Sequence, residues 1–212
     1  MKRFEIVDRL IRSVSSSQNG LDNKYDPLYI ESLIPSLYGE AIILDYNGSK
    51  ERAASKRISG DCIFSTTLAI NPAIQDSTAE YLLFELPSPP VRVNSRVNGL
   101  IYCGQKQQAI AFSEMYNRMD ISIAKKRGFF SDGNDIAFII KGVYIEVWGN
   151  KDLQEIDIDI VPQDVSKFPT WDETTDKYPV TEDLVKLMEI LFQASQGINL
   201  RIQPDNVLNK VQ

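Results

Sequence analysis

Apolar residues recur at helical spacing over residues 3–14 and again over residues 30–42, where side chains three or four positions apart share one face of a helix. Asp26 and Pro27 precede the second stretch as an N-terminal cap and a first helical residue. Pro35 lies inside that stretch, and we expect it to kink or delay the helix rather than to end it. The apolar stripes comprise Phe4, Val7, Leu10, Ile11 and Val14 in the first helix, and Ile30, Leu33, Ile34, Leu37, Tyr38, Ala41 and Ile42 in the second.

A third helix is predicted over Thr181–Gln196, and we expect the rest of the chain to pack against it. Thr181 can cap its first turn, and Gly197 can take the left-handed conformation that ends a helix. Its apolar face is formed by Leu184, Leu187, Met188, Leu191 and Phe192, and is widened by Val185 and Ile190.

Between residues 61 and 161 the apolar period changes to two, which is typical of strands. Asn98-Gly99 predicts a type I′ hairpin turn, and Lys141-Gly142 predicts a second tight hairpin. The expected strands are Cys62–Ile70, Tyr81–Leu86, Val91–Val93, Leu100–Cys103, Met119–Ala124, Ile136–Ile140, Val143–Trp148 and Glu155–Val161.

A run of strands between helices indicates an α+β fold. We expect two N-terminal helices, an antiparallel meander of about eight short strands inserted after them, and a C-terminal helix packed with the N-terminal pair. The corresponding parts are residues 1–60 (helical), 61–162 (β) and 163–212 (connector, closing helix and tail), and the helical parts would form one unit.

Composition narrows the possible chemistry more than any motif does. The 212 residues include no histidine, which removes histidine-based triads and almost all catalytic zinc sites. The net charge of −6 argues against binding of nucleic acid through its phosphates. No run of about 18 apolar residues is present, and the N-terminus lacks the apolar core of a signal peptide, so we expect a protein that stays in the cytoplasm of the cell that makes it.

Two groups of residues are candidates for a functional site. Glu155, Asp157 and Asp159 alternate with isoleucines, so they would share one strand face, either as ordinary solvent-facing acids or, less simply, as ligands of a divalent cation. Residues 162–180 form a long polar connector with three aromatic side chains, which strap it onto its own domain or dock another chain. These aromatic residues are Phe168, Trp171 and Tyr178.

Cys62 and Cys103 have no spacing that suggests a disulfide or a metal site, and a cysteine nucleophile would lack a histidine to activate it. We therefore expect no catalytic residues, no metal and no cofactor.

Several stretches resemble head-to-tail connector (ring) proteins of tailed bacteriophages, in particular those of crAss-like phages. Helix 30–42 ends in a sequence similar to the corresponding helix of that family, and two hairpin segments resemble its recurrent hairpins. The entry to the closing helix and part of the tail are also similar, although Leu208-Asn209 departs from the family's tail pattern. The matching segments are Ile30–Ile42, Val97–Gly104, Ile139–Val147, Tyr178–Leu184 and Pro204–Asn206.

The resemblance implies a structural virion protein at the head–tail junction, made in the host cytoplasm. Its copies would form a homo-oligomeric ring between the portal protein and the adjacent connector or tail proteins. DNA would pass through the ring without sequence-specific binding, and no membrane would be involved. Under this hypothesis the acids Glu155, Asp157 and Asp159 face the lumen, and the subunit interface contains Phe168, Trp171, Tyr178, Ile202 and Pro204.

Three alternatives remain. The first is another phage assembly or neck protein, and the second is a non-enzymatic binding module for a small molecule or peptide. A metal-dependent hydrolase that uses Glu155, Asp157 and Asp159 is the weakest alternative.

Overall fold

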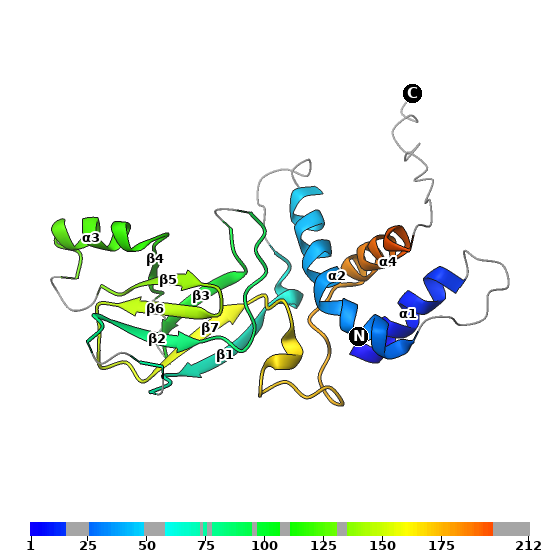
Figure 1. The fold of residues 1–212 in the computed structure, drawn as a ribbon, viewed down its shortest axis with the longest axis horizontal. Helices are drawn as coiled ribbons and strands as arrows, with labels where there is room; N and C mark the ends of the chain where they lie inside the picture. Colours follow the sequence, from blue (N-terminus) through cyan, green and yellow to red (C-terminus); the bar gives the residue numbers. More distant parts are fainter. Residues whose placement is uncertain are drawn as a thin grey trace, which may run out of the picture.

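The computed structural model describes residues 1–15, 26–48, 58–72, 74–75, 78–94, 97–106, 111–130 and 135–196. The fold is α+β, as the sequence predicts (Figure 1). Its helices are α1 (Arg3–Ser15), α2 (Pro27–Gly48), α3 (Arg118–Lys126) and α4 (Glu182–Ser195), with short 3-10 turns η2 (Gly60–Cys62) and η3 (Val165–Lys167). Its strands are β1 (Phe64–Ala69), β2 (Tyr81–Glu85), β3 (Leu100–Gln105), β4 (Ser113–Glu114), β5 (Ala137–Lys141), β6 (Tyr144–Trp148) and β7 (Glu155–Ile160).

The strands form two sheets, one of order β1-β7-β3 and one of order β2-β6-β5-β4. The predicted antiparallel meander is therefore wrong: β7 returns from the end of the β region to lie between β1 and β3, and β4 pairs with β5 in parallel. Side-chain alternation can indicate a strand but not its neighbour, because the alternation is the same whichever strand lies alongside. Apolar side chains from both sheets share one core, which includes Leu68, Phe84, Phe138, Ile145, Ile156 and Ile158.

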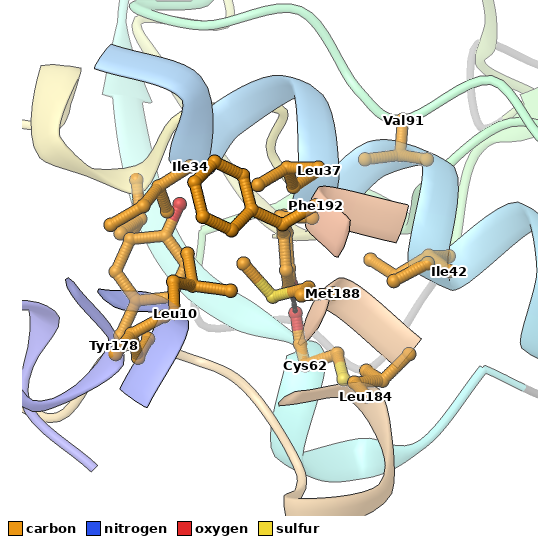
Figure 2. Packing of buried hydrophobic residues seen from close by; sticks show 14 of the residues in the cluster. Leu10, Ile34, Leu37, Ile42, Cys62, Val91, Tyr178, Leu184, Met188 and Phe192 are labelled. Carbon is orange, nitrogen blue, oxygen red and sulfur yellow. Dashed lines mark hydrogen bonds between the residues drawn. The ribbon is translucent and has the colours of Figure 1, made fainter. Parts of the chain in front are cut away.

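Helices α1, α2 and α4 surround a second core at the other end of the molecule (Figure 1). Leu10 of α1, Ile34 of α2 and Phe192 of α4 converge there, as Figure 2 shows. Val91 and Cys62, which belong to the β region by sequence, also contribute to this core. The β region thus contributes side chains to both cores.

The start of α2 follows the sequence signal. The Asp26 carboxylate accepts a hydrogen bond from the Leu28 amide at 3.0 Å, and the helix ends at Gly48. Pro35 lies inside the helix, as expected. The predicted cap of α4 is also confirmed, since the Thr181 hydroxyl accepts a hydrogen bond from the Leu184 amide.

Two members of the predicted apolar stripes are exposed. Phe4 of α1 is 59% exposed, whereas Ile6, which the stripe omitted, is fully buried. Ile190 of α4 is 44% exposed, so it does not widen the buried face. Helix α1 packs against both α2 and α4, and the direction of those two neighbours, which periodicity cannot supply, decides which residues are covered.

The expected strand over Met119–Ala124 is wrong, because these residues belong to α3. The Asn117 side chain caps this helix by accepting hydrogen bonds from the Met119 and Asp120 amides. Lys125 and Lys126 lie in the last turn, where the helix dipole favours positive charge. Alternation over six residues was too short to distinguish a strand from an exposed helix that buries only Ile121.

The type I′ turn expected at Asn98-Gly99 is absent. In place of the strand expected over Val91–Val93, the structure has a single isolated bridge between Arg92 and Asn98. The Val93 amide donates to the Val97 carbonyl, which places the reversal before Asn98. Gly99 instead lies against the next segment: a Cβ atom there would be 2.7 Å from the Val161 carbonyl oxygen. Glycine is required at this position by close backbone approach and not by a positive φ.

The second hairpin is confirmed, since β5 and β6 are antiparallel and Lys141 pairs with Tyr144. Its loop is Gly142-Val143, with Gly142 at a φ of 63°. Among the described residues, no helix is both long enough and apolar enough to cross a membrane.

Candidate functional site

The three predicted acids lie in a row on the outer face of the β1-β7-β3 sheet. In β7, Ile156, Ile158 and Ile160 are buried, while the alternating acids are half-exposed. This alternation was predicted as the ordinary pattern of a half-buried strand, and it is confirmed. The strand is central in its sheet, so the acids do not protect a free edge.

Neighbouring strands hold each carboxylate in place. The Ser65 hydroxyl donates to Asp159 Oδ1 at 2.6 Å, and the Thr67 hydroxyl donates to Asp157 Oδ1 at 2.7 Å. Both are cross-strand pairs of β1 and β7. On the β3 side, Lys106 Nζ lies 2.5 Å from Glu155 Oε2. The row is therefore a fixed array of hydrogen-bonded carboxylates.

The face keeps a negative electrostatic character despite Lys106. The pKa of Tyr102, which pairs with Asp159 across the sheet, is raised by partial burial and by the charges of Asp157 and Asp159. The pKa of Lys106 is raised by its hydrogen bond to Glu155 and by the charge of that carboxylate. Within the described part of the chain, no group of three or more acidic or cysteine side chains is arranged to hold a metal ion. The arrangement suits repulsion of anions better than metal chemistry.

Two of the three connector aromatics belong to the protein's own cores. Phe168 is 2% exposed in the core between the sheets, where its ring centroid lies 5.0 Å from that of Phe64. Tyr178 is 2% exposed in the helical core, with its ring 5.4 Å from that of Tyr38. Side chains buried in this way do not present a surface to another subunit. Phe168 and Tyr178 therefore hold the connector on its own domain, which is the first of the two interpretations given above.

Trp171 lies between these two anchors and is half-buried. It packs against both cores, and its ring centroid is 6.2 Å from that of Tyr178. Its indole nitrogen is buried and has no hydrogen-bond partner among the described residues. Of the predicted interface residues, Ile202 and Pro204 lie outside the described residues.

Neither cysteine has the environment of a nucleophile. Both thiols are free and buried. Burial raises the pKa of Cys62 to about 11, and it raises that of Cys103 further. A thiol reacts as its thiolate, which is disfavoured at both positions.

A buried acid that was not predicted from the sequence lies on the outer face of the other sheet. Glu146 of β6 is 3% exposed and accepts hydrogen bonds from Arg118 Nη2 at 2.7 Å and from Lys141 Nζ at 2.8 Å. Arg118 also donates to the Tyr81 hydroxyl and lies over the Tyr81 ring. The alternation in β6 placed Glu146 in solvent, and only recognition of α3 as a helix on that face would have predicted its burial.

A comparison of the chain with models of protein families finds no match, and a comparison with curated proteins finds none either.

Proposed function

We propose that this chain is a non-enzymatic structural protein of a tailed bacteriophage, and that its copies form a ring of the head-to-tail connector between the portal and the tail. The resemblance of the segments described above suggests the family. The lack of histidine and the burial of both thiols agree with a protein without catalytic chemistry.

The observation that carries the proposal is the row Glu155, Asp157 and Asp159. Carboxylates two residues apart on a strand are about 7 Å from one another, so the row forms a continuous negative strip. Such a strip repels DNA phosphates, and DNA can slide past it without adhering. In the proposed ring this face lines the lumen, and the hydroxyls of Ser65 and Thr67 keep its carboxylates in place.

The proposed ring has a heterologous interface, in which one surface of a subunit meets a different surface of the next. Phe168 and Tyr178 stabilise the subunit itself, so the proposed contacts of the connector reduce to the exposed part of Trp171. Ile202 and Pro204 of the tail remain proposed interface residues, and the portal and adjacent tail proteins remain the proposed partners.

The first test is the absolute mass of the purified protein by light scattering over a concentration series, alone and with the cognate portal, together with negative-stain images. We expect a ring of fixed copy number, with the portal as template if the protein alone is monomeric. A strict monomer under both conditions would contradict the ring and favour a binding module.

A second test concerns the lumen. We expect the double variant Asp157→Lys, Asp159→Lys to assemble and to retain linear duplex DNA at low salt, because the strip becomes basic. The matched control Asp183→Lys, Glu189→Lys on α4 makes the same change in net charge away from the strip. If rings of the first variant retain no more DNA than rings of the control, or if a cryo-EM map places the row outside the lumen, the proposed orientation is wrong.

A further inference from the structure

The segment from Ala111 to Tyr116 passes from one sheet to the other. The Phe112 amide donates to the Cys103 carbonyl of β3, and then the Ser113 and Met115 amides donate to carbonyls at the β5 edge, at 2.9 Å in both cases. Backbone groups alternate in direction along a strand, so Glu114 of β4 directs its N–H and C=O away from β5. No backbone hydrogen bond joins this side of Glu114 to another described residue. Glu114 is thus a short free edge of the four-stranded sheet.

A hollow of about 250 Å³, with both polar and apolar residues in its lining, lies on one side of this edge. It opens toward the β5–β6 turn and the Pro89-Pro90 segment, the side on which Ile140 packs into the core between the sheets. Its polar lining includes both signs of charge, with the Arg92 guanidinium and the Glu114 carboxylate. Arg92 makes no hydrogen bond or ion pair with another described residue, whereas Glu114 Oε1 accepts a hydrogen bond from the side-chain nitrogen Nδ2 of Asn98 at 2.6 Å.

An apolar groove of about 450 Å³ lies on the other side of the same edge. It runs along α3, which covers the opposite face of the sheet (Figure 1). Its apolar lining is formed by Met115, Tyr116, Ile123, Ala124 and Phe129. Ile123 is 41% exposed and Tyr116 is 66% exposed, so apolar surface faces the groove directly. The hollow and the groove share Glu114, Met115 and Tyr116, and are therefore adjacent.

We propose that this edge binds an extended peptide segment of a partner protein, which pairs with Glu114 as an additional strand. Successive side chains of a strand point to opposite faces, so neighbouring peptide residues would enter the hollow and the groove in turn. In the hollow, Arg92 can donate and Glu114 can accept a hydrogen bond. A side-chain amide carries both an acceptor oxygen and N–H donors, so it can bond to both residues. A carboxylate has acceptors only and cannot bond to Glu114. The groove takes a large apolar side chain. The recognised sequence is therefore asparagine or glutamine next to leucine, isoleucine, methionine or phenylalanine. Binding of this peptide does not depend on ring formation.

The test is selection of seven-residue linear peptides from a random display library on the purified protein. We expect the selected peptides to carry the amide–apolar pair. The best of them, synthesised with a fluorophore and measured by anisotropy, should bind Arg92→Ala and Ile123→Asp at least tenfold more weakly than the unmodified protein. Methylation of the peptide nitrogen that pairs with Glu114 should also abolish binding, because a strand contact needs that N–H.

Matched controls separate the site from general effects on charge and apolar surface. Arg12→Ala removes an exposed arginine of α1, and Ile190→Asp places the same charge on an isoleucine of α4 with similar exposure. Both should bind the peptide as the unmodified protein does, and thermal unfolding should show that all four variants are folded. Selection of no peptide, selected peptides without the pair, or equal binding by Arg92→Ala and Ile123→Asp would each overturn the proposal.

Discussion

Glu146 is the one charged residue that is buried among the residues that the structure describes. Burial by itself would raise its pKa, but the hydrogen bonds and charges of Arg118 and Lys141 outweigh burial, so the pKa of the carboxyl is lowered. The two cations are half-exposed, whereas the carboxylate is nearly inaccessible. Glu146 therefore links α3, which carries Arg118, to the β5–β6 hairpin, which carries Lys141.

We expect Glu146→Gln to lower the free energy of unfolding by about 1–3 kcal/mol at pH 7, because charge-assisted hydrogen bonds to two cations are lost. The native carboxyl has the lower pKa, so its contribution is complete above the unfolded-state value of about 4.3 and disappears as pH falls through the native value. Urea unfolding at pH 7 and at pH 3 should thus show a smaller difference between variant and unmodified protein at pH 3.

Glu85→Gln is the matched control, since Glu85 is an exposed acid on the adjacent strand β2. It should change stability by no more than about 0.5 kcal/mol at either pH. A difference for Glu146→Gln that is the same at both pH values would show that the charge is not what stabilises the cluster.

At the scale of elements, α3 and α4 are both capped by a polar side chain but differ in what they bury. Helix α4 buries Leu184, Val185, Met188 and Phe192 in the helical core, whereas α3 buries only Ile121. Opening of α4 therefore requires loss of the core, and opening of α3 requires only detachment from the sheet.

Removal of the two caps should have different consequences. We expect Thr181→Ala to lower the global free energy of unfolding by about 1 kcal/mol. Asn117→Ala should lower it by less than about 0.5 kcal/mol, while amide hydrogen exchange in residues 118–126 becomes several-fold faster. Chemical denaturation and native-state exchange measure the two effects.

Asn117→Ser is the control, since serine is also a favourable cap and should restore slow exchange in α3. If Asn117→Ala reduces global stability as much as Thr181→Ala does, α3 is part of the cooperative core and its local opening is excluded.

At the level of the whole molecule, the connector of residues 162–180 links the two cores. Phe168 is anchored between the sheets, Tyr178 is anchored between the helices, and Trp171 contacts both cores. The backbone adds further ties: the Tyr178 amide donates to the Met1 carbonyl, and the Tyr38 hydroxyl donates to the Pro179 carbonyl at 2.8 Å. The connector, residues 162–180, therefore couples the stability of the helical part to that of the β part.

We expect Phe168→Ala to lower the free energy of unfolding by about 3–5 kcal/mol, because it leaves a cavity in a closed core. The loss should appear in the isolated subunit by calorimetry or denaturant unfolding, before any assembly. Phe4→Ala removes an equal side chain that is 59% exposed and should cost less than about 0.5 kcal/mol. If Phe168→Ala leaves the subunit as stable as Phe4→Ala does, Phe168 does not stabilise the core between the sheets.

The predictable features of this chain are those set by neighbouring residues. Asp26 and Thr181 cap helices where the sequence indicates, and the isoleucines of β7 are buried in alternation with its acids. The wrong predictions concern features that depend on contacts between segments far apart in the chain. Phe168 and Tyr178 were as compatible with an interface as with a core, because aromatic character does not say what covers a side chain.

Propensity, capping and periodicity act over a few residues, and they are enough to predict the α+β class, the extents of α1 and α4, the start of α2 and most strands. The composition is enough to exclude histidine chemistry. Local patterns do not predict that β7 lies between β1 and β3, that residues 118–126 are helical, or that Glu146 is buried. These features depend on contacts between segments far apart in the chain, and their free energy arises from burial against a particular neighbour rather than from local preference.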